Sequence, residues 1–269
     1  MRQLLLLTLS LFLSAAATAG ISLQGKAQPG AALFGKATPG SDILLDGKPV
    51  PISADGHFII GFGRDAKGTH TLKEITPDGN SNKLIELSPR EYKLEKVDGL
   101  PPSKVSPQKP EVLARIKREG AQVATARTRR DAQRLDYLDG FIWPVKGRLS
   151  GFYGSQRILN GVPKRPHYGL DIAADTGTGI VAPAAGIITL AADDLYYSGG
   201  TIILDHGQGF SSTFLHMSKV EVEVGQRVEQ GENIGKVGAT GRASGPHLDW
   251  RMNWLDQRVD PQPLLPAAE

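Results

Sequence analysis

Two short stretches about eighty residues apart carry imidazole and carboxylate side chains at close spacing. His167 precedes Asp171 by four residues, and His247 precedes Asp249 by two. In an extended chain, residues separated by an even number of positions project from the same face, so both polar groups of each pair point the same way. Two such pairs facing each other would form a mixed nitrogen and oxygen site suited to zinc or a similar divalent ion, with a position left for water.

The composition of the 269 residues limits what this site can be. The chain has no cysteine, which excludes disulfides, thiolate zinc sites and a cysteine nucleophile. A content of 40% hydrophobic and 22% charged residues is that of a globular protein, and the length allows two domains with a core each. The net charge of +3 and the pI near 9.0 favour an anionic neighbourhood such as cell wall, phospholipid head groups or nucleic acid, without choosing among them.

The elements that must position these side chains begin after a secretory leader. Residues 1–3 are a short basic start, residues 4–13 are almost wholly apolar, and Ala17-Thr18-Ala19 supplies the small residues after which a signal peptidase cleaves. The apolar run is too short for a membrane anchor, and no later stretch is apolar enough to span a bilayer. We therefore predict a signal peptide over residues 1–19 and a periplasmic or cell-envelope location.

Residues 20–100 are predicted to form a small β domain. The whole chain has 32 glycines and 18 prolines, which favour turns and short strands. In this region, Asp-Gly pairs at 46–47, 55–56 and 78–79 separate short apolar runs. The layout resembles the immunoglobulin-like or transthyretin-like sandwiches of secreted proteins. His57 and His70 fall in this region without partner motifs and are interpreted as ordinary strand or surface residues.

Residues 101–140 are predicted to be a linker. The stretch 101–110 is rich in proline and therefore stiff, and Glu111 to about Leu138 can be helical because no further proline interrupts it. Between Lys109 and Arg134 the chain has eight Lys or Arg against three Asp or Glu. These charges indicate either a basic arm that touches an anionic polymer or a solvated spacer helix, and we favour the spacer.

Residues 141–269 are predicted to form a compact domain of antiparallel strands with the polar side chains in a groove. Strand-like runs at 179–182, 186–190, 201–204 and 212–215 are divided by Gly, Pro and Asp. Four of the six histidines lie here, at positions 167, 206, 216 and 247. His206 directly precedes Gly207, which favours a turn residue over a metal ligand. The predicted fold class is all-β throughout, with a helical linker.

At this point a family resemblance is visible. The segment from about Gly147 to Pro261 resembles the lysostaphin-like zinc metallopeptidases of family M23, which cut peptide cross-links in bacterial cell walls. The residues that carry the resemblance are His167-Tyr168-Gly169-Leu170-Asp171, Ala182-Pro183-Ala184-Ala185-Gly186, Asp205-His206-Gly207, Leu215-His216-Met217 and the glycine-rich stretch before His247. It does not extend to the N-terminal region.

The resemblance implies roles for individual residues. His167 and Asp171 match the first two metal ligands of the family, and His216 and His247 match its two non-ligand histidines, which act around the reacting water. The family's third ligand is a second histidine two residues after the position of His247. This chain has Asp249 there.

The exchange of histidine for Asp249 has a physical consequence. Aspartate ligates zinc, and at this spacing its side chain leaves the same strand face as His247. Two carboxylates and one imidazole neutralise a divalent ion, whereas two imidazoles and one carboxylate leave it one positive charge. We therefore expect the ion to acidify its bound water less and to polarise a carbonyl less. The site should still bind a divalent ion, more weakly or with more tolerance for manganese or iron.

The sequence thus predicts a secreted metalloendopeptidase that hydrolyses peptide cross-links of peptidoglycan. The implied cofactor is Zn²⁺ or another divalent ion, and the implied partners are peptidoglycan peptide stems, not nucleic acid. Asp249 keeps a second function open, a degenerate relative that binds cell wall or activates another cell-wall hydrolase. The glycine corners between Gly225 and Gly235 also resemble carrier modules, but a carrier gives no reason for the His and Asp residues.

Overall fold

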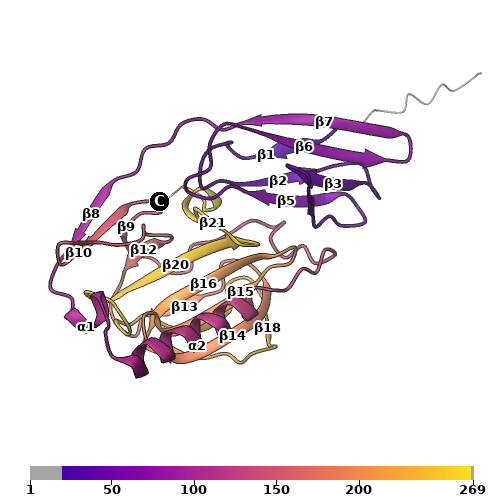
Figure 1. The fold of residues 1–269 in the computed structure, drawn as a ribbon. Coiled ribbons are helices and arrows are strands. Elements are labelled where there is room, and N and C mark those ends of the chain that lie inside the picture. The colour runs from indigo at the N-terminus through magenta and orange to yellow at the C-terminus, as the bar shows by residue number, and fades with distance from the viewer. Residues whose placement is uncertain (1–19, 268–269) are drawn as a thin grey trace, which may run out of the picture.

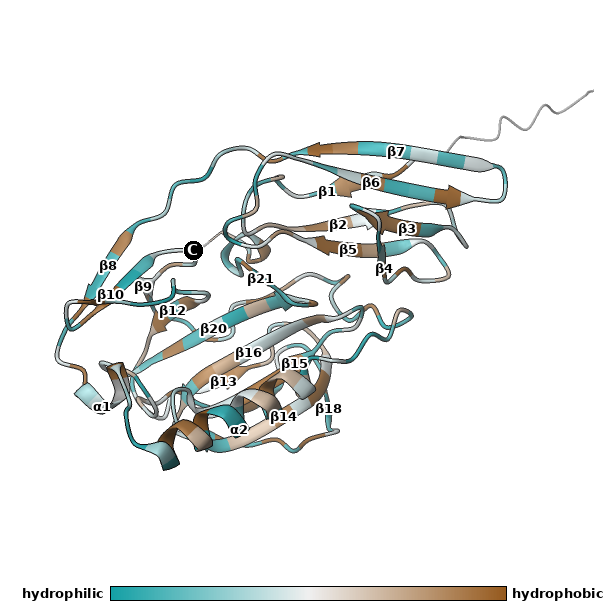
Figure 2. Cartoon of the chain, viewed as in Figure 1, coloured by the Kyte–Doolittle hydropathy of each residue, from teal (hydrophilic) through white to brown (hydrophobic). Residues whose placement is uncertain are grey.

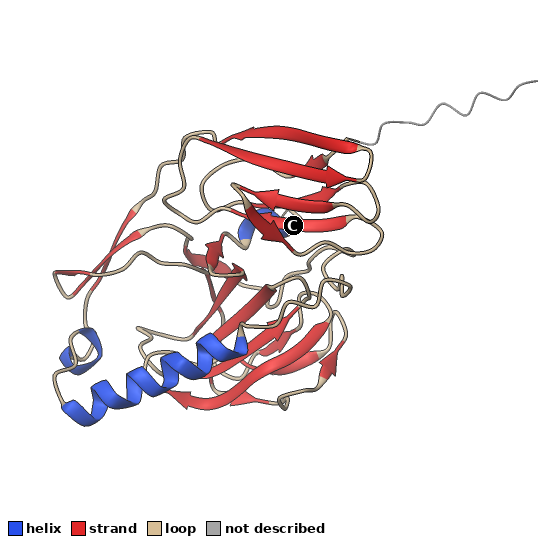
Figure 3. Cartoon of the chain, turned by 45° about the vertical axis from the view of Figure 1, so that its right-hand side comes forward, coloured by secondary structure: helices blue, strands red, loops and turns tan. Residues whose placement is uncertain are grey.

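Strands joined by short turns make up most of residues 20–267, which are the residues described by the computed structural model (Figure 1). The predicted all-β class is therefore confirmed. The two α-helices, α1 (Pro102–Val105) and α2 (Pro110–Ala126), lie together at one side of the molecule (Figure 3). The predicted signal peptide lies outside the described residues. None of the helices in residues 20–267 has the length and hydrophobicity that a bilayer span requires.

Seven N-terminal strands form two antiparallel sheets, with strand orders β1-β2-β5 and β4-β3-β6-β7. Their bounds are β1 Ser22–Gln24, β2 Ala32–Lys36, β3 Asp42–Leu45, β4 Lys48–Val50, β5 His57–Gly61, β6 Thr69–Thr76 and β7 Gly79–Glu86. The β3–β4 hairpin turns at Asp46 and Gly47, whose φ angles of 49° and 77° are both positive, as a type I′ turn requires. The Asp-Gly signal in the sequence therefore predicted this turn correctly.

A short extended segment connects the N-terminal strands to the helices. β8 (Leu94–Val97) pairs in parallel with β10 (Gln156–Leu159), and β11 (Val162–Pro163) completes this small sheet. Hydrophobic patterning did not predict β8, because its alternation is short and none of its residues is buried. The parallel pairing brings the end of the N-terminal region alongside the C-terminal strands.

The helix within the predicted linker, residues 101–140, is shorter than the sequence predicts. We expected it to run to about Leu138, but α2 ends at Ala126, its only buried residue. Beyond the helix the backbone bonds to the C-terminal sheet, as where Asp136 N–H donates to His206 O at 3.1 Å. These tertiary hydrogen bonds take the place of further helical ones, so the helix cannot continue. Hydrophilic and hydrophobic residues alternate over the surface of α2, in keeping with a mostly solvated helix (Figure 2).

The C-terminal half is built on an eight-stranded sheet with the order β18-β14-β15-β16-β20-β12-β9, in which β21 also pairs with β20. β12 (Leu170–Ala173), β16 (Phe210–Met217) and β20 (His247–Trp254) lie next to one another. The other elements are β9 Arg148–Gly151, β13 Gly179–Val181, β14 Gly186–Leu195, β15 Gly199–Asp205, β17 Lys219–Val220, β18 Arg227–Val228, β19 Asn233–Lys236, β21 Gln257–Val259 and the 3₁₀ helix η1 Gln262–Leu264. β13, β19 and β17 form a separate three-stranded sheet.

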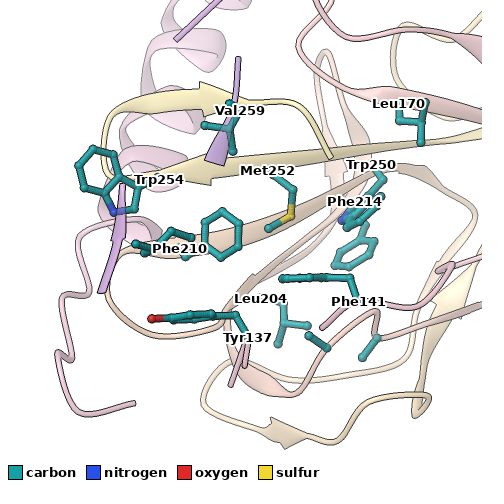
Figure 4. Packing of buried hydrophobic residues seen from close by; sticks show 14 of the residues in the cluster. Tyr137, Phe141, Leu170, Leu204, Phe210, Phe214, Trp250, Met252, Trp254 and Val259 are labelled. Carbon is teal, nitrogen blue, oxygen red and sulfur yellow. The ribbon is translucent and has the colours of Figure 1, made fainter. Parts of the chain in front are cut away.

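Buried aromatic side chains join the two halves into one core. Phe210, Phe214 and Trp250 project from β16 and β20 into a cluster with Phe141 (Figure 4). Phe34 of the N-terminal β2 reaches this cluster, with its ring centroid 6.2 Å from that of Phe210. Burial of each such side chain stabilises the folded state by roughly 1.5–3 kcal/mol. The N-terminal strands therefore pack against one side of the C-terminal sheet and stabilise it.

Candidate metal centre

Strand pairing places the two carboxylates of the predicted metal site side by side. Asp171 of β12 and Asp249 of β20 are direct partners on neighbouring antiparallel strands. His167 lies in the loop before β12. Two backbone hydrogen bonds hold it there: His167 N–H donates to Ser155 O at 2.8 Å, and Gly154 N–H donates to His167 O at 2.8 Å. One donor atom from each of the three side chains lies within 4.8 Å of the others, the one such group in residues 20–267.

Two of these donor atoms are buried and lack a hydrogen-bond partner within the described chain. His167 Nε2 and Asp171 Oδ1 lie 3.0 Å apart, yet neither takes part in a hydrogen bond. A buried polar atom left unsatisfied costs about 1–3 kcal/mol. Two ligands of one tetrahedral zinc ion, each bound at about 2.0–2.2 Å, would lie ~3.3–3.6 Å apart, a few tenths of an ångström more than this distance. The imidazole and the carboxylate therefore fit a shared divalent ion.

Two glycines make room for the carboxylates. A Cβ atom at Gly151 would lie 2.3 Å from Asp171 Oδ2, and one at Gly169 would lie 2.2 Å from Asp249 Oδ1. Neither glycine has a positive φ angle. It is therefore the space beside each carboxylate, and not backbone conformation, that requires glycine at these two positions.

His216 and His247 lie next to each other, with 4.9 Å between ring centroids. Each ring holds Nδ1 2.8 Å from a backbone carbonyl oxygen, that of Thr240 for His216 and that of Gly245 for His247. A carbonyl oxygen only accepts, so in the neutral ring Nδ1 carries the proton and Nε2 keeps its lone pair. His247 Nε2 lies 3.9 Å from Asp171 Oδ1, which brings this pair of histidines to the edge of the ligand group.

His216 has an unusual backbone. Its φ angle of 67° lies in the left-handed region, which non-glycine residues seldom adopt, and its N–H donates to Ser198 O at 2.7 Å. Burial lowers the pKa of His216 to about 4, although the charge of Asp249 acts in the opposite direction. The ring is therefore neutral at pH 7. Such strained residues persist where the surrounding structure holds them, often at functional sites.

Asp249 has a partner that the sequence analysis missed. Arg251 Nε lies 2.9 Å from Asp249 Oδ1, and Arg251 Nη2 lies 2.5 Å from Asp249 Oδ2, which makes a bidentate pair. Burial alone would raise the pKa of Asp249, but the Arg251 guanidinium and His167 hold it well below its usual range. The same i+2 rule that placed Asp249 beside His247 would have placed Arg251 on this face as well.

Asp171 also has an arginine partner. Arg157 Nη2 donates to Asp171 Oδ2 at 2.8 Å, and Arg157 Nε lies 3.3 Å from Glu95 Oε2. Burial and the neighbouring Asp249 raise the pKa of Asp171, while His167 and Arg157 lower it, with a net shift below its usual range. The arginine fixes one oxygen of Asp171 and leaves the other, Oδ1, directed toward His167.

Two further arginines lie close to Arg251 on the same side of the sheet. Arg127, just after α2, donates to Thr213 Oγ1 at 2.9 Å. Arg258 donates to the side chain of Asn253 at 2.8 Å. Burial together with Arg258 and Arg251 lowers the pKa of Arg127 to about 8, so positive charge is crowded here. Spacing in the sequence gives no sign of this cluster, because Arg127 reaches it only where the helix ends.

The other histidines lie outside this group. His206 is fully buried, with Nδ1 2.7 Å from Ala185 O and Nε2 2.8 Å from Ser212 Oγ. It lies directly before the turn at Gly207, as the sequence predicted. His57 and His70 lie on N-terminal strands and pair with Lys36 and Asp46, respectively.

A groove of about 340 Å³ opens onto the ligand group. Asp171, His216 and His247 line it, together with basic side chains of β8, β9, β10 and the loop before β20. The basic residues are Lys96, Arg148, Arg157 and Arg242, and Glu95 and Val97 of β8 and Leu100 just after it also line the groove. A larger hollow of about 640 Å³ beside α2 is lined half by helix residues and by none of the histidines. The groove, and not this hollow, therefore borders the ligand group.

The chain is similar to known proteins over most of its length. Residues 165–261 match peptidase family M23. A crystal structure of a peptidase M23 from Pseudomonas aeruginosa has 34% sequence identity and a TM-score of 0.68, and the alignment covers 89% of this chain and 95% of that one. The similarity therefore includes the N-terminal strands and not only the sheet with the ligands.

Curated relatives match a little under half of this chain. Peptidoglycan DD-endopeptidase ShyA of Vibrio cholerae is 36% identical over 114 residues, or 41% of this chain and 26% of the relative. Cell division protein DipM of Caulobacter vibrioides is 32% identical over 132 residues, or 47% of this chain and 21% of the relative. The chain thus matches about a quarter or less of the length of these two proteins.

Proposed function

The chain belongs to peptidase family M23, and from that premise we propose that it is a secreted, metal-dependent endopeptidase that hydrolyses peptide cross-links of bacterial peptidoglycan. The observation that carries the proposal is the convergence of His167, Asp171 and Asp249, with two donor atoms buried and unpaired. These three side chains would hold Zn²⁺ or another divalent ion. The named activity of ShyA, a peptidoglycan DD-endopeptidase, supports the choice of substrate.

The residues around the ligand group have separate tasks. A bound divalent ion supplies Lewis-acid polarisation of the scissile carbonyl and a nucleophilic water at neutral pH. His216 and His247 each offer a free Nε2 lone pair, oriented by the Nδ1 bond to a carbonyl oxygen, and can accept a proton or hydrogen-bond the reacting groups. Arg157 keeps Asp171 in position through its second oxygen.

The groove suits the anionic peptide stems of the wall. Lys96 and Arg148 line it, and neither forms an ion pair or a side-chain hydrogen bond in the described part of the chain. Free carboxylates of a stem peptide would therefore meet unpaired positive charge close to the scissile bond. The predicted signal peptide at residues 1–19 would deliver the protein to this substrate in the periplasm or envelope.

One observation favours a second function. Both oxygens of Asp249 already accept hydrogen bonds from Arg251, an arrangement that would also suit a site that holds no ion. In that case the chain would bind cell wall, or activate another hydrolase, without cutting. The two functions differ in their dependence on metal.

Digestion of purified peptidoglycan by the full-length mature chain tests the choice. We expect the release of soluble peptides with new amino termini, its loss after treatment with a chelator, and its recovery when zinc is added back. Binding to peptidoglycan without release of peptides, in zinc-loaded protein, would contradict the peptidase and support the second function. The full chain is used because the N-terminal strands share its core.

Gly151→Ala is expected to damage the site without unfolding the protein. The new methyl group would lie 2.3 Å from Asp171 Oδ2 and would push that carboxylate off its bond to Arg157. Changes to the groups that orient a metal ligand typically cost 10- to 100-fold in metal affinity, and we expect a loss of about that size in a zinc titration.

Gly120→Ala provides the matched control for Gly151→Ala. Gly120 lies within α2 with no atom within 4 Å of the added methyl group. The substitution should leave zinc affinity unchanged and raise stability by about 0.5–1 kcal/mol. An equal loss of zinc affinity in both variants would show that the space beside Asp171 is not what matters.

A further inference from the structure

The carboxylate of Asp249 faces two ways. Toward β12 one of its oxygens lies within 4.8 Å of donor atoms of His167 and Asp171, and along its own strand it forms the bidentate pair with Arg251. Asp249 is 1% exposed and the Arg251 side chain is 22% exposed, so water screens this pair little. Each carboxylate oxygen has two lone pairs, so a hydrogen bond from Arg251 leaves a lone pair on the same oxygen for an ion.

The two arginines at the site do not affect its charge equally. Arg157 lies between two carboxylates, Glu95 and Asp171, so it can neutralise only one of them. Arg251 has Asp249 as its only ion-pair partner among the described residues. Counted together, Glu95 with Arg157 is neutral, Asp249 with Arg251 is neutral, and Asp171 keeps its negative charge. A divalent ion at this site would therefore retain one net positive charge.

We propose that Asp249 and Arg251 work together as one electrically neutral ligand, in which Arg251 is a positioning residue that orients Asp249 and cancels its charge. The inference rests on the metal-dependent function proposed above. From the sequence alone, the two carboxylates Asp171 and Asp249 are expected to neutralise the ion and make it a weaker Lewis acid. A neutral Asp249–Arg251 pair would avoid this loss. With Arg251 counted, the pair contributes the charge of an imidazole, and the ion keeps its polarising power.

A purely structural account of the same pair exists. Arg127, Arg251 and Arg258 are crowded together, and Asp249 is the carboxylate that offsets them. On that account, removing Arg251 would relieve like-charge repulsion with no specific effect on the ion. The two accounts differ in what they predict for zinc affinity and for turnover, which can be measured separately.

The decisive variant is Arg251→Gln in the full-length chain, with Arg251→Lys as its matched control. Glutamine keeps an amide donor for Asp249 but removes the charge, so the ligand group becomes more negative by one unit. Zinc should then bind at least about tenfold more tightly, because a unit charge at short range in a protein shifts a binding constant by that much or more. The kcat for peptidoglycan should fall at least about tenfold, because a neutralised ion polarises a carbonyl less.

Arg251→Lys gives up the bidentate geometry but keeps the charge. Because the charge sets the attraction for the ion, zinc affinity should stay within about threefold of the parent chain. The double variant Asp249→His/Arg251→Gln restores a neutral ligand by other means and should also lie within about threefold. Asp249→His alone leaves Arg251 without its carboxylate beside the ion and should bind zinc at least about tenfold more weakly. The expected order of zinc affinity is thus Arg251→Gln first, the parent chain and the double variant together, and Asp249→His last.

Zinc affinity is measured by competition with a chromophoric chelator, and folding of each variant by circular dichroism. If Arg251→Gln binds zinc no more tightly than the parent chain, or loses affinity and turnover together, the inference is wrong while the peptidase stands. If Arg251→Gln does not fold, the double variant decides, and zinc binding tenfold away from that of the parent chain overturns the inference. A parent chain that takes up no zinc would overturn both the inference and the proposed metal-dependent function.

Discussion

Replacing His216 with asparagine is expected to lower kcat for peptidoglycan hydrolysis by about 10²- to 10⁴-fold, the range lost when a positioned acid or base is removed. The neutral imidazole, held by Thr240 O at 2.8 Å, keeps a free Nε2 lone pair in the groove that Asp171 also lines. Asparagine is chosen because it tolerates the left-handed φ angle of 67° at this position better than alanine does. Initial rates of peptide release, with zinc content determined on the same sample, measure the effect.

The control for this variant is His57→Asn, on a strand of the N-terminal sheets where the histidine pairs with Lys36. It should keep the parent rate within about twofold, since surface changes away from special features have small effects. Zinc content should be unchanged in both variants because neither histidine is a proposed ligand. A His216→Asn chain with more than a tenth of the parent kcat would show that His216 is not the acid or base.

Asp249→Asn is expected to reduce the free energy of unfolding by about 3–5 kcal/mol, the usual cost of breaking a buried ion pair from one side. The variant leaves the Arg251 guanidinium without a carboxylate in a place that Arg127 and Arg258 already make positive. Urea unfolding with chelator present measures this loss apart from any effect of metal. The loss is independent of whether the ion binds.

The double variant Asp249→Asn/Arg251→Gln tests the cause of that loss. Replacing both partners by neutral groups of similar shape removes the unpaired charge, and such replacements are often nearly neutral. We expect stability within about 1.5 kcal/mol of the parent chain. A single variant that costs less than 1 kcal/mol would mean that Arg251 finds another partner or reaches water when Asp249 is gone.

The parts of the structure that local spacing controls were predictable. The Asp46-Gly47 turn, the strand-like runs of the C-terminal sheet and the all-β class follow from turn chemistry and short apolar segments. The pairs His167 with Asp171 and His247 with Asp249 also follow from spacing. That the two pairs meet depends on the register of β12 against β20, which the sequence alone does not define but the family resemblance implied.

The parts that depend on distant neighbours were not predictable in the same way. The end of α2 is decided by hydrogen bonds to the turn after β15, more than seventy residues away along the chain. Arg157 and Glu95 belong to strands whose parallel pairing has no local signal. Arg251 was within reach of the same-face rule and was overlooked, since arginine is not a metal ligand. Its effect on the charge of the site appears only when its distance to Asp249 is known.

The wall that β8 builds beside the groove has a consequence for how such proteins diversify. Three residues that line the groove lie before the segment that matches the peptidase family: Glu95, Lys96 and Arg157. Arg157, which also pairs with Glu95, holds the proposed metal ligand Asp171 in position. A chimera that joins only residues 165–261 to another protein would keep the three proposed metal ligands but lose the groove residues that β8 and Arg157 supply. We expect exchange of residues 90–100 between homologues to alter which peptides are admitted while the reaction itself is preserved.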